Sequence, residues 1–352
     1  MPHPMMTPEA LQEAIQRLPR VPLAHRPTPL DDCPVLSQAL GGPRILAKRD
    51  DLTGPAFGGN KVRHLEFRMG LLQHGGYDVY IGQYPPTSNE ARIAAAACAR
   101  AGIRFILLVK KGDRIGVPQG NVLLYHLLGA EMVFLDTDDP EAVKTEVQAL
   151  EERLRRAGHR PFTFQFSPWT HLSGVIGHLD AALEIDRQLQ ERAIEEAHFY
   201  IVAGRSHTGL QLAAKLLGRP WRVTGVAVQR YAHFPDVIPE WSRGVAEALG
   251  LPATLGPEEL DIDYRYIDTY DLVLDSAVEA IKLAARTENL ILDPMYTGKA
   301  MAVLMDHVRT GRVTPDETVV FMHTGGTPLV FQYAQELSAD LVRVREVSEL
   351  PA

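Results

Sequence analysis

The sequence has few of the features that mark several classes of protein. Among its 352 residues only Cys33 and Cys98 are cysteines, and Cys98 lies in an alanine-rich run, so we expect no disulfide framework. No stretch approaches the roughly 20 apolar residues that cross a bilayer, and the first 20 residues lack an apolar core of signal-peptide length. We therefore expect a protein of the cytoplasm with no membrane partner.

Excess positive charge and low-complexity tracts are also absent. The formal net charge is −8, and the lysines and arginines are scattered along the chain, so nucleic acid is not an expected partner. Hydrophobic residues make up 45% and charged residues 23%, which is typical of a folded globular protein. The length suits two α/β lobes that share a cleft.

Short β-rich runs alternate with helical patterns along the chain. The runs are Asp78–Gly82, Phe105–Val109, Met132–Leu135, Phe199–Val202, Val223–Val228 and Thr318–Met322. Between the first two, Glu90–Ala101 followed by Gly102 reads as a helix with a glycine stop, and Thr137–Arg160 reads as a loop and a solvated helix. This alternation predicts an α/β fold with open, mostly parallel, twisted sheets.

A helix is also predicted from Asn60, which we take as its N-cap, to Gly75. Its apolar residues are three and four apart and share one face: Val62, Leu65, Met69 and Leu72. Lys61 then lies in the first turn, after the paired glycines 58 and 59. A helix N-terminus lowers the pKa of a lysine and favours an anion, so Lys61 is a candidate amine nucleophile. The alternative is an exposed lysine that follows an ordinary turn.

A second glycine turn, Val202–Leu210, follows the Phe199 strand and precedes a helix predicted over Leu210–Leu217. A strand, a glycine turn and a helix can hold a phosphate on backbone N–H groups, with help from the hydroxyls of Ser206 and Thr208 and from Arg205. The alternative is a plain βα turn. On this pattern His207 is expected to be a loop histidine and not a catalyst.

Two late segments place polar groups at the ends of strands or helices: Asp293–Lys299 and His323–Pro328. Thr324 follows an apolar strand, and open α/β sheets bind ligands at such carboxyl ends. Local turns that use Thr324 and Tyr296 only for their own hydrogen bonds are the alternative. No metal site is expected, because His171 and His178 are seven residues apart without a carboxylate or cysteine pattern.

Together these segments resemble the family of 1-aminocyclopropane-1-carboxylate (ACC) deaminase and D-cysteine desulfhydrase, from about residue 26 to 331. The motifs that carry the resemblance are Lys48–Gly54, Phe57–Arg63, Gly120–Leu124, Asp293–Ala300 and His323–Gly326. The resemblance implies a two-lobed pyridoxal-5'-phosphate (PLP) enzyme of fold type II, with its active site between the lobes. It implies a discontinuous large PLP-binding domain, residues 1–52 and 165–352, and a small domain, residues 53–164. A homodimer is also what the family suggests.

The same resemblance assigns roles to individual residues. Lys61 corresponds to the Schiff-base lysine, Asn89 to the partner of the cofactor's phenolic oxygen and Thr324 to the partner of its pyridine nitrogen. Ser88, Tyr296 and Tyr270 correspond to catalytic residues near the substrate. The phosphate cup corresponds to Gly204, Arg205, Ser206, His207, Thr208 and Gly209. PLP chemistry needs such an amine, a phosphate anchor and contacts that tune the ring.

The chain also departs from the family pattern. Thr87 stands before Ser88 where the family has glutamine, and Ala203 and Arg205 alter the glycine-rich cup. The loop from Ser167 to His171 replaces a stretch of small residues, so we expect Trp169 and His171 to change the shape of the substrate pocket. These departures fall on parts that recognise the substrate, so the fold and cofactor are predicted more firmly than the substrate.

The predicted function is a PLP-dependent lyase that acts on a small amino acid, most similar to D-cysteine desulfhydrase. It would eliminate a β-substituent and release ammonia and a 2-oxo acid. Thr297 favours this activity, because ACC deaminases carry glutamate after the tyrosine. Alternatives are ACC deaminase, a divergent member such as a sulfo-lyase or a biosynthetic enzyme on an unusual amino acid, or a PLP-binding protein without turnover.

Overall fold

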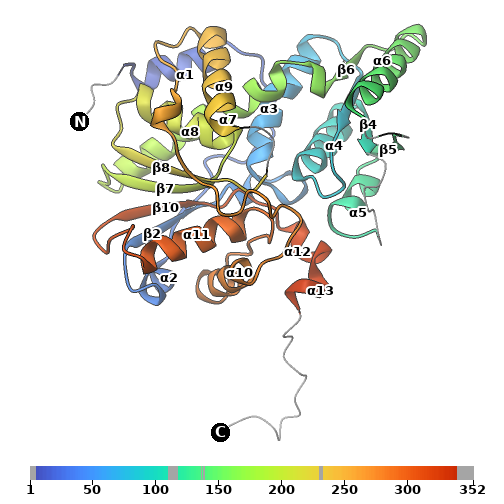
Figure 1. Ribbon diagram of the computed structural model, residues 1–352. Coiled ribbons are helices and arrows are strands. Elements are labelled where there is room, and N and C mark those ends of the chain that lie inside the picture. The colour runs from blue at the N-terminus through green and yellow to red at the C-terminus, as the bar shows by residue number, and fades with distance from the viewer. Residues whose placement is uncertain (1–4, 110–117, 136, 138, 230–232, 339–352) are drawn as a thin grey trace, which may run out of the picture.

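The computed structural model describes residues 5–109, 118–135, 137, 139–229 and 233–338. Across these residues the strands form two separate sheets, one of six strands and one of four, which helices cover (Figure 1). No helix within the described ranges is long and apolar enough to cross a membrane. Cys33 and Cys98 are both buried and free, as expected.

The six-stranded sheet has the order β1-β2-β10-β7-β8-β9. Its strands are β1 (Leu30–Asp32), β2 (Arg44–Lys48), β7 (Ala197–Val202), β8 (Trp221–Val226), β9 (Asp261–Asp263) and β10 (Thr318–Met322). β1 is antiparallel to β2, and the other pairings are parallel. In parallel strands the carboxyl ends meet at one edge of the sheet, so the loops after β7 and β10 open on the same side.

Helices cover both faces of this sheet (Figure 1). One face carries α1 (Pro8–Gln16), α7 (Trp169–Gln190), α8 (Arg205–Leu216) and α9 (Phe234–Leu249), and the other carries α2 (Pro34–Ala39), α10 (Asp275–Glu288) and α11 (Thr297–Arg309). Alternate residues of a strand face opposite sides. In β7, Phe199 and Ile201 accordingly pack in the core under α7 and α8, and Tyr200 packs in the core under α11.

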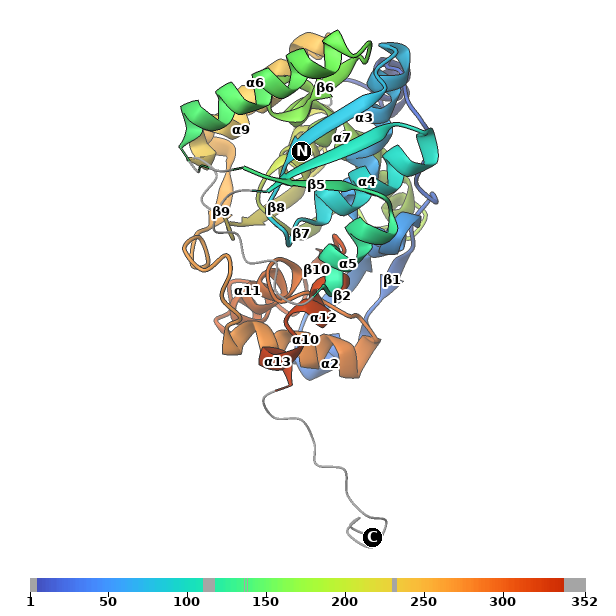
Figure 2. The same ribbon diagram turned by 90° about the vertical axis from the view of Figure 1, so that its right-hand side faces the viewer.

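The four-stranded sheet is parallel and has the order β5-β4-β3-β6. Its strands are β3 (Val79–Gln83), β4 (Arg104–Val109), β5 (Glu131–Phe134) and β6 (Pro161–Thr163). One face packs on α6 (Pro140–Arg156), and the other packs on α3 (Asn60–His74), α4 (Asn89–Ala101) and α5 (Gly120–Leu127), as Figure 2 shows. Short elements complete the fold: η1 (Asp50–Leu52), η2 (Pro55–Phe57), η3 (Phe164–Phe166), η4 (Pro257–Glu259), α12 (Pro328–Gln332) and α13 (Ala334–Leu337).

Helix α3 packs on α4 and also on α7, so it lies between the two sheets (Figure 1). The turn that leads into α3 has positive φ angles at Ala56, Phe57, Gly58 and Gly59. A Cβ atom on Gly58 would lie 2.1 Å from the carbonyl oxygen of Asp51, so only glycine fits there. The chain therefore enters α3 through a tight, crowded turn that fixes the position of Lys61.

The α/β class, the mostly parallel sheets and all six predicted strands are confirmed, with shifts of a residue or two at their ends. α4 ends at Gly102, in the left-handed region at φ +67°, as predicted. Strands β1, β2, β6 and β9 were not predicted. The division into a large domain and a small one stays a prediction. The strands of the four-stranded sheet all lie within 79–163, and those of the six-stranded sheet come from both sides of that range.

Two local predictions are wrong. Asn60 is the first residue of α3 and does not cap it; Gly59 holds the N-cap position, and the Asn60 amide donates instead to Ser206 Oγ at 2.8 Å. Helix α8 begins at Arg205 and not at Leu210. Gly204, at φ +142°, turns the chain directly from β7 into the helix, and the Thr208 hydroxyl donates back to the Gly204 carbonyl. The expected phosphate loop is therefore the first turn of a helix.

Candidate active site

Lys61 lies in the first turn of α3, between the two sheets. Lys61 is half-buried. Desolvation of its amine, together with the positive charges of Arg205 and Arg68, lowers the pKa of Lys61 to about 8, against the opposing effect of Glu90. Among the described residues, none forms a hydrogen bond or salt bridge with its amine. At pH 7 about a tenth of such an amine is neutral, against roughly 3 in 10,000 for an ordinary lysine. Lys61 is thus a ready nucleophile and base.

Other buried lysines are committed to protein partners. The Lys48 amine pairs with Glu184 Oε1 at 2.5 Å and donates to the carbonyl oxygen of Thr28 at 2.8 Å. Burial lowers the pKa of Lys299 to about 8 as well, but its amine donates to the backbone carbonyls of Thr269 and Tyr270. Lys299 therefore holds the backbone around Tyr270 in place, and of these three amines that of Lys61 is the one available for chemistry.

The glycine turn before α3 touches the loop after β10. The Asn60 N–H donates to the Thr324 carbonyl at 3.0 Å, and a Cβ atom on Gly59 would lie 3.0 Å from the same oxygen. The Thr324 side chain is buried, and its hydroxyl has no hydrogen bond to any residue in the described ranges. Thr324 and Lys61 are therefore neighbours across two close loops, and the Thr324 hydroxyl is free to meet a ligand.

The Ser88 loop precedes α4, which contacts the glycine turn before Lys61. Ser88 caps α4 by accepting from the Ala91 N–H at 3.1 Å. Asn121 donates to Asn89 Oδ1 at 3.0 Å, which fixes the orientation of the Asn89 amide and leaves its NH₂ group free as a donor. Arg92 then joins this loop to the glycine turn, because its guanidinium donates to Gly58 O at 3.2 Å and to the carbonyl of Ala56.

Tyr296 and Tyr270 form a pair at the start of α11. Their hydroxyls are 2.6 Å apart, and Gln229 donates to Tyr296 at 3.3 Å. Tyr270 also bonds to the side chain of Thr87, next to Ser88, and burial raises its pKa, so it stays protonated at neutral pH. The tyrosine pair from the six-stranded lobe therefore reaches the Ser88 loop of the four-stranded lobe.

Two residues of the expected phosphate cup, His207 and Gly209, serve packing in this structure. The buried His207 ring lies against Gly225 of β8. Gly209 serves the packing of α8 on α7, because a Cβ atom there would lie 2.4 Å from Val175 O. What remains available is the N-terminus of α8, open space around Gly204, and the Ser206 hydroxyl, which contacts Asn60 and lies 3.0 Å from His64 Nε2.

Two charged residues near Lys61, Glu90 and Arg68, were missed in the sequence. Glu90 accepts from Arg205 Nη2 at 2.5 Å and pairs with Arg68 Nη1 at 2.9 Å. Burial alone would raise the pKa of Glu90, but Arg205 and Arg68 hold it well below its usual range. Their positions in the sequence could have indicated them. Arg68 is seven residues after Lys61 and so lies on the same face of the helix, and Glu90 directly follows Asn89.

The segment from Ser167 to His171 leads directly into α7. Trp169 begins α7 and packs against the core beneath α7 and α8, and the His171 ring stacks on Trp241 with centroids 5.0 Å apart. The Thr170 carbonyl, however, accepts from Arg205 at 2.8 Å. The narrowing of the pocket by Trp169 and His171 stays a prediction.

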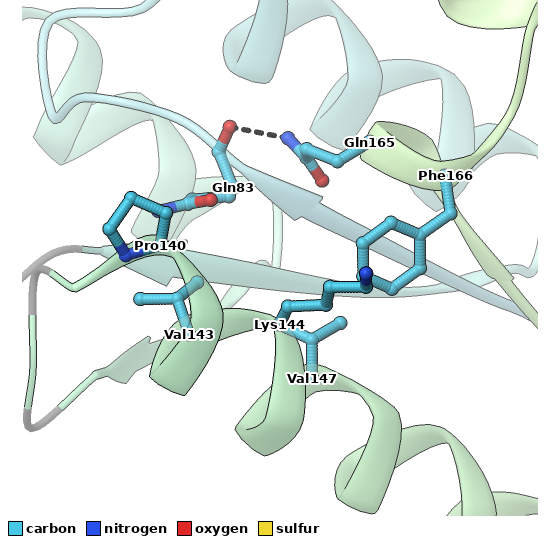
Figure 3. A pocket seen from close by; sticks show the side chains of 7 residues that line it. All are labelled: Gln83, Pro140, Val143, Lys144, Val147, Gln165 and Phe166. Carbon is cyan, nitrogen blue, oxygen red and sulfur yellow. Dashed lines mark hydrogen bonds between the residues drawn. The ribbon is translucent and has the colours of Figure 1, made fainter.

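A separate pocket of about 220 Å³ lies beside α6 (Figure 3). Its lining residues are Gln83, Pro140, Val143, Lys144, Val147, Gln165 and Phe166. The Gln165 amide donates to the Gln83 carbonyl at 2.7 Å at one end of it. None of the residues predicted for the active site lines this pocket, which belongs to the four-stranded lobe.

The chain is similar to known proteins in both sequence and structure. A family model described as pyridoxal-phosphate dependent enzyme matches residues 21–325. D-cysteine desulfhydrases of Salmonella newport (strain SL254) and Salmonella typhi are each 35% identical over 330 residues, or 91% of this chain and 97% of theirs. The crystal structure of an ACC deaminase homologue is 30% identical, with a TM-score of 0.82, and covers 96% of this chain and 100% of its own.

A more distant likeness concerns the fold alone. The processed form of threonine deaminase isoform 2 from Solanum lycopersicum is 19% identical with a TM-score of 0.64, and covers 96% of this chain and 90% of its own. The α/β fold with its two mostly parallel sheets is that of an enzyme. The chain belongs to the family of pyridoxal-phosphate dependent enzymes. The predicted family, fold class and PLP dependence are confirmed, and the predicted lyase class agrees with these relatives.

The residues around Lys61 fit this cofactor. The free amine of Lys61, the free NH₂ group of Asn89 and the free hydroxyl of Thr324 come from three loops that touch one another. The open N-terminus of α8 at Gly204 can accept a phosphate. When bound, PLP supplies an electron sink that makes the α-proton of an amino acid acidic.

Proposed function

We propose that this protein is a PLP-dependent lyase that degrades D-cysteine, eliminating the thiol and releasing ammonia and a 2-oxo acid. The observation that carries the proposal is 35% identity, over 91% of the chain, to D-cysteine desulfhydrases. Lys61, Ser88, Tyr270 and Tyr296 are its proposed catalytic residues. The proposed cofactor-binding residues are Lys61, Asn89, Gly204, Arg205, Ser206, His207, Thr208, Gly209 and Thr324, where Gly209 acts by letting α8 pack close to α7.

Each of the proposed catalytic residues has a task that suits its surroundings. The Lys61 amine, with its pKa lowered to about 8, takes the α-proton from the substrate. Tyr296 and Tyr270 share a hydrogen bond of 2.6 Å, and burial raises the pKa of Tyr270, so this pair can orient the substrate and donate a proton to the departing sulfur. Ser88 keeps its hydroxyl hydrogen free while its oxygen accepts from Ala91, which suits contact with the substrate carboxylate.

Thr297 supports this activity over ACC deamination. Its buried hydroxyl donates to Asp293 Oδ2 at 2.7 Å and accepts from the Asp293 N–H at 2.8 Å. Burial already raises the pKa of Asp293. A glutamate at position 297, as the ACC deaminases carry, would place a second carboxylate against the first in a site without room for it.

Assays of the purified protein with D-cysteine, L-cysteine, D-serine, cysteate and ACC test the proposal. The expected result is release of 2-oxo acid and sulfide from D-cysteine, with a preference over the L-enantiomer. Turnover of ACC without turnover of D-cysteine would favour the deaminase alternative. Bound PLP without turnover of any of these compounds would favour a binding protein or a divergent substrate.

We also propose a homodimer, because the family suggests it, and location in the cytoplasm, which the two separate, buried cysteines support. Light scattering on the purified protein tests the first proposal. A mass of about 78 kDa, twice the 39.0 kDa of the chain, is expected. Fractionation of cells that express the tagged protein tests the second.

A further inference from the structure

Arg205 stands where the cofactor phosphate would meet the protein. It is the first residue of α8 and directly follows Gly204, whose surroundings are open. Because α8 begins this early, the cup has lost the glycine-rich loop that holds a phosphate by backbone contacts alone. One helix N-terminus and one hydroxyl, that of Ser206, remain for a group that carries close to two negative charges.

The Arg205 guanidinium is bound inside the protein. It donates to both carboxylate oxygens of Glu90, at 3.2 and 2.5 Å, and to the Thr170 carbonyl at 2.8 Å. Its side chain is 16% exposed and that of Glu90 is 6% exposed. Glu90 belongs to α4 of the four-stranded lobe and Arg205 to α8 of the six-stranded lobe, so this ion pair spans the two lobes beside Lys61.

The charges around Glu90 do not balance. Arg68, which is fully buried, pairs with the same carboxylate at 2.9 Å, and neither arginine has a second carboxylate partner in the described part of the chain. Two guanidinium groups therefore share one carboxylate, close to the Lys61 amine. A buried excess of positive charge is costly unless an anion joins it, and a phosphate at the start of α8 would be that anion.

We propose that Arg205 is a phosphate anchor which Glu90 holds in the cofactor-free protein: when PLP is present, Arg205 pairs with the phosphate and Glu90 keeps Arg68. Each carboxylate or phosphate then has its own guanidinium. Arginine suits this exchange, since its planar group forms paired, charge-assisted hydrogen bonds with either anion. The inference rests on the proposed function for its cofactor, and it names the residue that takes over from the shortened cup.

The test compares PLP with pyridoxal, which lacks the phosphate, by equilibrium titration of protein stripped of cofactor with hydroxylamine. Arg205→Ala should weaken PLP binding about 10- to 100-fold and leave pyridoxal binding nearly unchanged. Glu90→Gln should tighten PLP binding, because no carboxylate then competes for Arg205. Arg219→Ala is the matched control: Arg219 pairs with Asp186 at 2.6 Å and follows α8, so both affinities should stay at the wild-type values.

Arg205→Lys, which keeps the charge but loses the paired geometry, should recover part of the PLP affinity, and thermal denaturation shows whether each variant is folded. Equal losses for PLP and pyridoxal in folded Arg205→Ala, or no loss for either, would overturn the assignment of the phosphate anchor. Unchanged or weaker PLP binding in Glu90→Gln would overturn the exchange. Failure of the wild-type protein to bind PLP would overturn the proposed function too, whereas normal PLP binding without D-cysteine turnover would leave the anchor standing.

Discussion

At the scale of single residues, the proposed reactivity of this protein depends on the surroundings of one lysine, Lys61. Lys61 has no carboxylate partner of its own in the described structure, and two guanidinium groups lie near it. Burial and like charges disfavour the protonated amine. A residue that would be inert on the surface at neutral pH thereby becomes a nucleophile, without help from a neighbouring general base.

The pH dependence of Lys61 can be predicted with its sign. In cofactor-free protein, acylation of Lys61 should rise with an apparent pKa near 8 and not near 10.5. Arg205→Ala removes a charge that lowers this pKa, so the apparent pKa should rise. Glu90→Gln removes a charge that raises it, so the apparent pKa should fall. Mass spectrometry of Lys61 peptides over a pH series measures both shifts, with the exposed Lys144 peptide as the internal standard. Shifts of the opposite sign would show that these charges do not act on Lys61.

The sequence could predict those site residues that stand in short local motifs. Lys61, Asn89, Thr324 and Tyr296 stand in motifs, so the sequence alone was enough to propose them. Glu90 and Arg68 could not be proposed in this way, because the feature that marks them is their ion pair. That ion pair forms only when α3, α4 and α8 pack together. Lys299 was seen only as part of a motif, and its contact with the backbone before Tyr270 spans 29 to 30 residues.

At the scale of elements, close contact between α7 and α8 sets the position of the α8 N-terminus, the proposed phosphate site. Gly174, Gly177 and Gly209 stand at this contact or at that of α7 with α3. At Gly209 an added Cβ would lie 2.4 Å from the Val175 carbonyl and 2.7 Å from the His178 Cβ. Neither atom is at the flexible end of a side chain, so α7 and α8 would have to move apart to make room for the added Cβ.

Gly209→Ala should therefore lower the free energy of unfolding by about 1–3 kcal/mol and weaken PLP binding as α8 shifts. Gly244→Ala is the control, since its added Cβ meets only a methyl group of Leu172, at 3.0 Å. Within helix α9 that change should be neutral or stabilising by roughly 0.5–1 kcal/mol. Urea unfolding of both variants measures the difference. Equal stability of the two variants would mean that the α7 and α8 contact tolerates a methyl group.

The sequence predicted α3, α4 and the central parallel strands, but it did not predict the long helices α9, α10 and α11 or several short strands. The buried parallel strands read as apolar runs, and α4 has both its alanine-rich body and its glycine stop in the sequence. Strands β1, β6 and β9 have three residues each, too few to show a period. The start of α8 was misread because Arg205–Thr208 is polar and resembles a loop, whereas the buried faces of this turn are fixed by α7 and β8.

At the scale of the whole molecule, a buried network of charges ties α3 to β2 and α7. Arg63 pairs with Asp50 at 2.8 Å and with Glu184 at 3.1 Å, and Glu184 also binds Lys48. Burial would raise the pKa of Asp50, but Arg63 and His178 hold it far below its usual value. Burial would likewise raise the pKa of Glu184, but the nearby charges, chiefly that of Arg63, lower it. This network fixes the helix that carries Lys61.

The network predicts sensitivity to acid. A carboxyl group whose pKa is lowered on folding contributes stability that is complete above its ordinary pKa, near 4, and is lost as the pH falls further. Asp50→Asn should cost about 3–5 kcal/mol at pH 7, because it leaves Arg63 partly unpaired in the core, and should flatten the decline of stability below pH 4. Asp32→Asn, in an exposed pair with Arg44, should cost about 1 kcal/mol or less. Unfolding curves from pH 3 to 7 measure both, and similar costs for the two variants would contradict the structural role given to Asp50.

The most direct test of the account is the identity of the lysine that holds the cofactor. We predict that the purified protein is yellow, and that reduction with borohydride followed by digestion and mass spectrometry places the phosphopyridoxyl group on Lys61. Lys61→Ala should give a colourless protein that borohydride does not label. A label on Lys299, whose pKa is also lowered to about 8, or on the ion-paired Lys48 would contradict the assignment and the active site built around it.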